Sequence, residues 1–262
     1  MSRARDTANQ INRVNSSAAD ATAITVDSGE RIGIGETSPN ADLVVKQSGS
    51  TFTPSSQTVA LFQRNTATGS GAKVCILSGN NTSGDLNFGD AEDEDIGRLR
   101  YEHNNNAMTF TTNGAERMRI DASGYVTKPN HPAFQAFAMG TNHSNAGGYI
   151  PFTHTILNQG NHFSTANDRF IAPVDGVYHF HFHSFIDQLN TTTGQIAFYK
   201  NGSWSWGGYE IRNYLTHRST GYGPVMVVTA TVGLAANDYV QVYTTVNLHA
   251  NAGNYFGGHL IG

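Results

Sequence analysis

The stretch Val177-Tyr-His-Phe-His-Phe-His-Ser-Phe-Ile186 alternates aromatic and polar side chains along its length. Successive side chains of a β-strand point to opposite faces of the sheet, so a period of two is typical of a strand with one buried face. Tyr178, Phe180 and Phe182 would share the core face. His179, His181 and His183 would share the other face, because hydrophobic side chains pack better than imidazoles in a dry core.

Further apolar segments surround this strand and lack helical periodicity. Their spacing predicts an antiparallel β-sandwich or jelly roll, and the whole chain is expected to be all-β. The other predicted strands of this region are Ala133–Met139, Phe170–Ala172, Gln195–Lys200, Pro224–Val232, Tyr239–Val246 and Tyr255–Ile261.

The composition changes near residue 130. The first 130 residues contain 27 charged and 6 aromatic side chains, whereas the remaining 132 contain 9 charged and 21 aromatic ones. Pro129 and Pro132 lie at the change, and proline cannot continue a strand ladder. We therefore predict an N-terminal attachment segment at 1–25, a β-rich fibrous shaft at 26–130 and a sandwich head at 131–262.

The shaft region is predicted to form short strands separated by Gly- and Asn-containing turns. In Met108-Thr-Phe-Thr111 the apolar residues would share one face and the threonines the other. Six aromatic residues cannot give one chain a dry core here, so several identical chains are expected to share their apolar faces. The predicted strands are Asp42–Lys46, Val59–Arg64, Ala72–Leu77, Asp85–Phe88, Arg98–Glu102, Ala107–Thr111 and Glu116–Ile120.

A short pattern occurs twice in the shaft region. Val26-Asp-Ser-Gly-Glu-Arg-Ile32 is similar to Ile120-Asp-Ala-Ser-Gly-Tyr-Val126. In both, an aliphatic residue precedes Asp, small residues with Gly follow, and the pattern returns to an aliphatic residue. The pattern indicates a modular shaft.

The N-terminal segment carries Ala8, Ile11, Val14 and Ala18 on one helical stripe. This stripe predicts either a short helix ordered against a partner or a frayed polar terminus. The first residues are charged and do not resemble a secretory signal. The sequence contains no run of 18 apolar residues, which a membrane-spanning helix would need. A net charge of −4 leaves no electrostatic surface for nucleic acid, and the single Cys75, expected as a buried thiol, excludes a disulfide scaffold.

The C-terminal region resembles the tumour-necrosis-factor-like jelly roll, in the form found in the globular head of complement component one q. The resemblance implies a tight homotrimer that binds ligands without catalysis. It also implies that His179, His181 and His183, together with His259, line the trimer axis. The residues that carry it are Phe170-Ile-Ala-Pro-Val-Asp-Gly-Val-Tyr-His-Phe180, Ala197-Phe-Tyr-Lys-Asn-Gly202, Leu234-Ala-Ala-Asn-Asp-Tyr-Val240 and Tyr255-Phe-Gly-Gly-His-Leu-Ile261.

The N-terminal region resembles the tail-fibre proteins of bacteriophages. One shaft motif is Arg31-Ile-Gly-Ile-Gly-Glu-Thr-Ser-Pro39 followed by Ala41-Asp-Leu-Val-Val45, and a second is Asn113-Gly-Ala-Glu-Arg-Met-Arg-Ile-Asp-Ala-Ser-Gly-Tyr-Val126. The second copy lacks the usual glycine-rich turn and Thr-Ser-Pro after it, which suggests that it closes the shaft.

The histidine row allows three interpretations. His-x-His pairs from three chains offer six nitrogens, enough for one octahedral transition-metal ion on the threefold axis. The imidazoles could instead pack against their symmetry copies with water or chloride, or form a plain surface row. No other cofactor is indicated.

Aromatic residues flanked by glycine cluster between Gly202 and Tyr222. Exposed aromatic rings suit stacking on the apolar faces of sugars, although these rings could also fill the core or the trimer interface. The candidate receptor-binding residues are Trp204, Trp206, Tyr209, Tyr214, His217, Arg218 and Tyr222. The acidic run Asp90-Ala-Glu-Asp-Glu-Asp95 lacks the spacing of an EF-hand and is interpreted as a solvated turn.

These observations favour a non-enzymatic, homotrimeric virion fibre protein. Its N-terminus would attach to other tail or capsid proteins, and its head would bind a glycan or protein on the host cell surface. A purely structural capsid, neck or baseplate fibre is the alternative. A glycan-cleaving tailspike enzyme would need two placed carboxylates, and no pair stands out among Asp168, Asp175, Asp187, Glu210 and Asp238.

Overall fold

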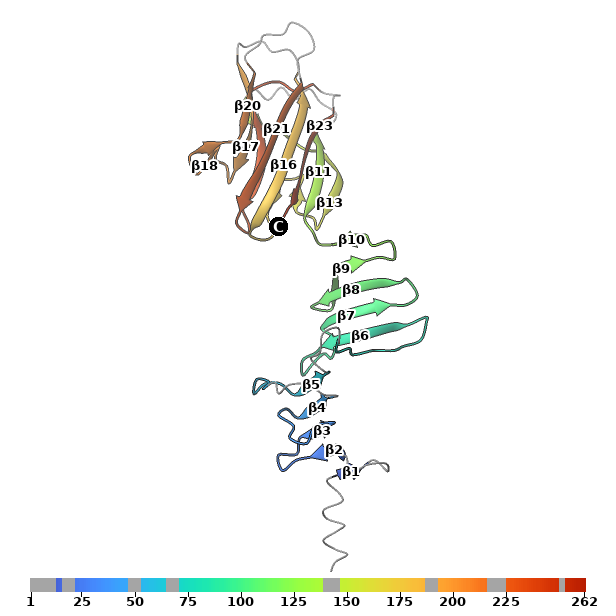
Figure 1. The fold of residues 1–262 in the computed structure, drawn as a ribbon. Coiled ribbons are helices and arrows are strands. Elements are labelled where there is room, and N and C mark those ends of the chain that lie inside the picture. The colour runs from blue at the N-terminus through green and yellow to red at the C-terminus, as the bar shows by residue number, and fades with distance from the viewer. Residues whose placement is uncertain are drawn as a thin grey trace, which may run out of the picture. The chain divides into compact units, whose positions relative to one another are not determined.

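The computed structural model describes residues 13–15, 22–46, 53–64, 71–138, 147–186, 193–215, 225–249 and 253–262. Every regular element within these ranges is a β-strand, which confirms the all-β prediction (Figure 1). The chain divides into two compact units, Met1–Ser78 and Gly79–Gly262. The described residues contain no helix with the length and apolarity needed to cross a bilayer.

The head is a sandwich of two antiparallel sheets, which confirms the predicted jelly roll. The first, called the β16 sheet, has the order β13-β11-β23-β16-β21. Its strands are β11 (Ala133–Ala138), β13 (His154–Gln159), β16 (Gly176–Phe185), β21 (Val225–Leu234) and β23 (Asn254–Leu260).

The second, called the β22 sheet, has the order β14-β15-β22-β17-β20, and β12 pairs with β22. Its strands are β12 (Gly148–Tyr149), β14 (Phe163–Ser164), β15 (Arg169–Ile171), β17 (Gly194–Lys200), β20 (Arg212–Leu215) and β22 (Tyr239–Thr244). A separate hairpin joins β18 (Ser205–Trp206) to β19 (Tyr209–Glu210).

The space between the two head sheets is filled mainly by aromatic rings. Phe180 is fully buried at the centre, and its ring lies 5.4 Å from that of Phe170 and 5.9 Å from that of Phe256. Phe134 stacks on Phe163 with a centroid separation of 4.9 Å. This dense packing supplies the core that the aromatic-rich half of the sequence predicts.

A second antiparallel sheet system precedes the head, with the order β10-β9-β8-β7-β6. A two-residue loop joins β8 to β9 at Asn113-Gly114, where both residues have positive φ angles of 51° and 66°. Such loops match the twist of the flanking strands. The strands are β6 (Ser83–Phe88), β7 (Gly97–Glu102), β8 (Ala107–Thr112), β9 (Ala115–Ile120) and β10 (Val126–Thr127).

The predicted alternation in β8 is present, but the threonine face is the better covered one. Thr109 is 3% exposed and Thr111 is 7% exposed, whereas Met108 and Phe110 are only half-buried. Thr109 lies between Arg100 and Arg119 of the neighbouring strands. The long arginine side chains therefore belong to the face on which the threonines are buried.

The first unit contains a small mixed sheet with the order β1-β2-β3-β4-β5. β3 pairs with β4 and β4 with β5 in parallel, while the other pairs are antiparallel. The strands are β1 (Arg13–Asn15), β2 (Thr22–Val26), β3 (Ile32–Ile34), β4 (Leu43–Lys46) and β5 (Ala60–Gln63).

Three sequence-based predictions fail in the first 130 residues, one in the N-terminal segment and two in the shaft region. Val14 lies in strand β1, so the predicted helix is wrong at this residue, and Ala8, Ile11 and Ala18 lie outside the described residues. Residues 72–77 form no strand within the described chain, and Leu77 is 88% exposed. The prediction of a buried thiol is also wrong, because Cys75 lies in this segment and is exposed.

The repeated sequence pattern is a repeated turn. Asp27 Oδ1 accepts the backbone N–H groups of Gly29 and Arg31 at 2.9 and 3.0 Å. Asp121 Oδ1 accepts those of Ser123 and Tyr125, both at 2.9 Å. The residue three positions after each Asp has a positive φ, 63° at Glu30 and 83° at Gly124. Two distant segments thus share one hydrogen-bonded geometry.

Candidate functional site

The histidine row lies on the outer face of the β16 sheet. Tyr178, Phe180 and Phe182 are fully buried, whereas His179, His181 and His183 are half-buried on the opposite face. The two faces predicted from the alternation are therefore confirmed. Whether this face meets a threefold axis stays a prediction, since it concerns other copies of the chain.

Neighbouring strands extend the row into a patch of imidazole and aromatic rings. His259 of β23 pairs with His179 in register, and their rings are 5.7 Å apart. The ring of Tyr255 stacks on His183 with a centroid separation of 4.9 Å. His179 Nδ1 also lies 3.1 Å from the Thr231 hydroxyl on β21.

A glycine on β23 makes room for the central imidazole. A Cβ atom at Gly257 would lie 2.5 Å from both Cε1 and Nε2 of His181, far inside van der Waals contact. Any larger residue at this position would displace the imidazole. Gly257 therefore has a packing role beside the histidine row, whereas a Cβ atom at Gly258 would lie 2.5 Å from Cδ1 of Phe180 on the core side.

Burial and the nearby imidazoles favour the neutral form of His181 and of His259. Burial lowers the pKa of His181, and the neighbouring His179 and His259 lower it further. Burial also lowers the pKa of His259, to which His179 and His131 contribute. Neutral imidazoles can pack together or act as metal ligands.

His131 is an addition that the sequence analysis missed. Its Nε2–H donates to the backbone carbonyl of Leu260 at 2.6 Å, next to His259. Within one copy, no three His, Cys, Asp or Glu side chains of the described residues gather closely enough to hold a metal ion. A metal on this face would need ligands from several chains, as the sequence-based hypothesis requires.

A second candidate surface is the β18–β19 hairpin beside the β22 sheet. Asn201-Gly202 forms a tight turn after β17, and both residues have positive φ angles of 52° and 79°. Gly207-Gly208 forms the tip of the hairpin with φ angles of 68° and 95°. Non-glycine residues rarely adopt such angles, which explains the glycines between the aromatic residues.

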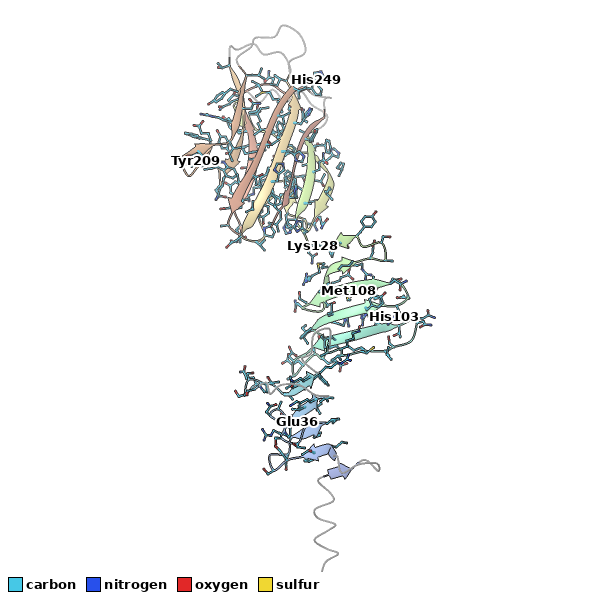
Figure 2. All side chains as sticks on the ribbon, viewed as in Figure 1. Glu36, His103, Met108, Lys128, Tyr209 and His249 are labelled. Atoms are coloured by element: carbon cyan, nitrogen blue, oxygen red, sulfur yellow. The ribbon has the colours of Figure 1, made fainter. Side chains whose placement is uncertain are left out.

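The two tryptophans of this segment occupy different environments. Trp206 is half-buried against the head core, and its Nε1–H donates to the Phe198 carbonyl at 3.0 Å. Trp204 is 49% exposed, and Tyr209 at the hairpin is 79% exposed. Figure 2 shows Tyr209 at the outer edge of the head. Trp204 and Tyr209 are thus accessible from solvent, whereas Trp206 packs against the core. Receptor contact by the candidate residues stays a prediction.

A cation joins the exposed aromatic residues. The Arg212 guanidinium lies 5.5 Å from the Trp204 ring centroid and 4.6 Å from that of Tyr214, which is 52% exposed. These are cation–π distances. An open groove of about 580 Å³ lies beside the hairpin and is lined in part by Trp206, Tyr209 and Ile211.

Sequence analysis did not identify Arg212 as a candidate. The other predicted residues of this loop, His217, Arg218 and Tyr222, lie outside the described residues.

The described carboxylates of the head are engaged in structural contacts. Asp168 accepts the Phe152 N–H at 2.7 Å, and burial raises the pKa of its carboxyl group. Asp175 accepts the Ala236 N–H at 2.7 Å, and Asp238 pairs with Lys200 at 2.7 Å. Glu210 pairs with Arg212. Asp187 lies outside the described residues.

The acidic run of the shaft forms a turn. Asp90 Oδ1 accepts the N–H groups of Glu92 and Asp93, both at 2.9 Å. These hydrogen bonds lower the pKa of Asp90. The Asp90 carboxylate therefore accepts backbone hydrogen bonds within the turn, which agrees with the interpretation of the acidic run as a solvated turn.

Comparison with known proteins locates the similarity in the head. Residues 133–261 match the family model described as C1q domain. The chain is similar to the globular domain of the zebrafish complement 1qA protein, with 17% identity over 50% of this chain and 98% of that one and a TM-score of 0.40. It is also similar to murine APRIL in a crystal structure at pH 5.0, with 14% identity over 50% of this chain and 99% of that one and a TM-score of 0.40.

Proposed function

Residues 133–261 form a C1q/TNF-like domain, and from this premise we propose that the chain is a homotrimeric virion fibre protein whose head binds the host cell surface. C1q/TNF-like domains commonly form trimers and bind ligands, and they are typically non-enzymatic binding modules. The head of this protein would supply the recognition surface. The N-terminal segment would attach to other virion tail or capsid proteins.

The exposed aromatic hairpin is the observation that carries ligand binding. Trp204, Tyr209 and Tyr214 expose between 49% and 79% of their surface, and Arg212 lies against two of them. Flat apolar rings can stack on a pyranose, and the guanidinium beside them can donate hydrogen bonds to the hydroxyl groups of the sugar. A surface glycan is therefore the proposed ligand class.

The resemblance of the shaft motifs to tail-fibre proteins supports location on a virion. The repeated turns at Asp27 and Asp121 agree with a modular shaft. Three heads on one fibre would engage repeated surface sugars together, and avidity would strengthen contacts that are individually weak. Antibody labelling and proteomic analysis of particles purified from the source of this sequence test the location.

Glycan binding can be tested with an array of bacterial surface polysaccharides. The probe is the labelled full-length protein, compared with a Trp204→Ala/Tyr209→Ala double variant. Loss of most binding by the double variant is expected. Tyr125→Ala removes an equally exposed tyrosine, 71% exposed, from outside the head and should leave binding unchanged. If the protein is present on virions but the unaltered protein binds no polysaccharide on the array, the receptor role is contradicted.

A further inference from the structure

The β6–β10 sheet has one apolar face that the described residues of the single chain do not fully cover. Leu86, Leu99, Phe110 and Met118 stand opposite one another across four strands. A second row contains Tyr101, Met108, Ile120 and Val126. Leu86 is 49% exposed, Val126 is 56% exposed and Phe88 at the strand end is 61% exposed. The central members of both rows are half-buried, so the face is partly open to solvent along its whole width. An apolar face left open in this way marks an interaction surface.

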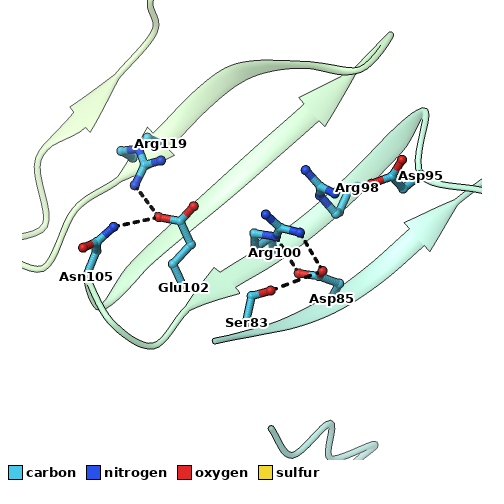
Figure 3. A network of polar contacts seen from close by, with 8 residues as sticks. All are labelled: Ser83, Asp85, Asp95, Arg98, Arg100, Glu102, Asn105 and Arg119. Carbon is cyan, nitrogen blue, oxygen red and sulfur yellow. Dashed lines mark hydrogen bonds and ion pairs between the residues drawn. The ribbon is translucent and has the colours of Figure 1, made fainter. Parts of the chain in front are cut away.

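The opposite face of the same sheet carries charged side chains that pair with one another (Figure 3). Arg100 binds the Asp85 carboxylate through two hydrogen bonds of 2.8 and 2.9 Å. Arg119 pairs with Glu102 at 2.8 Å and with Glu116 at 2.7 Å. Arg98 also pairs with Asp95, although its Nε is buried without a hydrogen-bond partner among the described residues. The carboxylates Asp85, Glu102 and Glu116 of this face are therefore each paired with an arginine within the chain.

The division into two faces recurs in the β1–β5 sheet. Ile34, Val45 and Phe62 lie in one row across adjacent strands, and Phe62 is 50% exposed. Val44, which points to the other face, is 1% exposed. Two separate sheets of the shaft region thus leave an apolar face open in the single chain.

The short connection to the head favours other copies of this chain as the partner that covers the apolar face of the β6–β10 sheet. Only the five residues 128–132 separate β10 from β11, so the chain between them spans at most about 20 Å. A trimeric head would hold three copies of this sheet within a few tens of ångströms of one another. Short tethers of this length give millimolar effective concentrations, at which self-complementary apolar faces associate.

We propose that the apolar face of the β6–β10 sheet packs against the same face of the other two copies, and that the charge-paired face points to solvent. This inference rests on the proposed trimer. The β6–β10 sheet would then be a second self-association module, separate from the head. The shaft would then obtain from three chains the core that one chain lacks.

Two adjacent residues of β6 offer a matched test. Leu86 and Asn87 are both exposed in the single chain but lie on opposite faces of the sheet. In a Cys75→Ser background, Leu86→Cys and Asn87→Cys are labelled with a maleimide in the native full-length protein. We expect labelling of Leu86→Cys at least about tenfold slower than that of Asn87→Cys, and equal rates after denaturation.

Two further measurements on the same samples separate the outcomes. Sedimentation reports the number of chains: a monomer overturns the trimer, whereas a trimer with equal labelling rates overturns only the inference about the sheet. Mild oxidation, which forms a disulfide between neighbouring thiols and needs no room for a maleimide, should link chains through Leu86→Cys and not through Asn87→Cys. Protection without linkage would mean that the chain covers its own sheet, which also overturns the inference. Phe88→Cys repeats the test if Leu86→Cys fails to fold.

Discussion

Replacement of Asp121 by Ala tests whether the repeated turn is a structural unit of the shaft. The Asp121 carboxylate accepts two backbone N–H groups at 2.9 Å, from Ser123 and Tyr125. The backbone closes the same turn through Asp121 N–H to Tyr125 O at 3.0 Å and Gly124 N–H to Asp121 O at 2.9 Å. The substitution removes the two side-chain bonds and leaves the backbone bonds.

The expected loss follows from these two bonds. Each intramolecular hydrogen bond contributes about 0.5–1.5 kcal/mol net, and the turn is exposed, so water replaces part of the lost interaction. A local destabilisation of about 1–2 kcal/mol is expected. It corresponds to a factor of about 5–30 in the population of the open turn.

Hydrogen exchange followed by mass spectrometry measures this opening directly. In Asp121→Ala, the peptide containing Ser123 and Tyr125 should exchange about 5–30 times faster, while head peptides should not change. Asp121→Asn retains an Oδ1 acceptor and should stay within a factor of about three of the unaltered protein. Asp27→Ala should accelerate exchange at Gly29 and Arg31 in the same way. Unchanged exchange in both alanine variants would refute the repeated-turn assignment.

Three further predictions concern the head. The lowered folded pKa values of His181 and His259 mean that the unfolded chain, with histidine pKa near 6.5, takes up protons first as the pH falls. The contribution of these histidines to head stability should therefore be fully present above about pH 6.5 and be lost progressively below it. Thermal melts between pH 8 and 5 should show a shallower decline for His181→Gln, and an equal decline would contradict the assignment. Phe180→Ala, at a fully buried ring, should cost about 3–5 kcal/mol in urea denaturation, and a loss below about 1 kcal/mol would contradict the packing. Trp206→Phe should lower the free energy of unfolding by about 1 kcal/mol, because it removes the hydrogen bond to the Phe198 carbonyl. Trp204→Phe, at the surface, should lower it by less than about 0.5 kcal/mol. Similar losses in the two variants would contradict the different environments of the two tryptophans.

The head could be predicted from sequence because its long strands carry their own pattern. The alternation in β16 locates both the buried aromatic row and the histidine row. Strand β13 (His154–Gln159) was missed because His-Thr-Ile-Leu-Asn-Gln shows no alternation, and its pairing with β11 defines it as an edge strand. An edge strand of this kind is recognised by its pairing with a neighbouring strand, and the local sequence pattern does not reveal that pairing.

The shaft was harder because a strand requires a partner as well as suitable residues. Residues 72–77 contain Val74, Cys75 and Ile76, which favour a strand, yet they form none in the single chain. The assumption that apolar neighbours imply burial then failed for Cys75. The short strands β2 and β3 were missed, although the repeated turn between them was visible in the sequence.

The candidate surfaces show which details need tertiary structure. Trp204 and Trp206 are two residues apart, and only the fold of the hairpin distinguishes the exposed indole from the packed one. Arg212 and Tyr214 lie two residues apart on β20, whereas the contact of Arg212 with Trp204 depends on how the segment before β18 folds back beside β20. The space that Gly257 leaves for His181 likewise comes from pairing between residues far apart in sequence.

Sedimentation equilibrium of the purified full-length protein tests the central claim most directly, because both the head face and the shaft face are expected to be shared among copies. One chain has a mass of 28.2 kDa. The account predicts a single species of three times that mass that persists on dilution to nanomolar concentration. A stable, folded species of 28.2 kDa, with the histidine face of the head and the apolar face of the shaft both unshared, would contradict it.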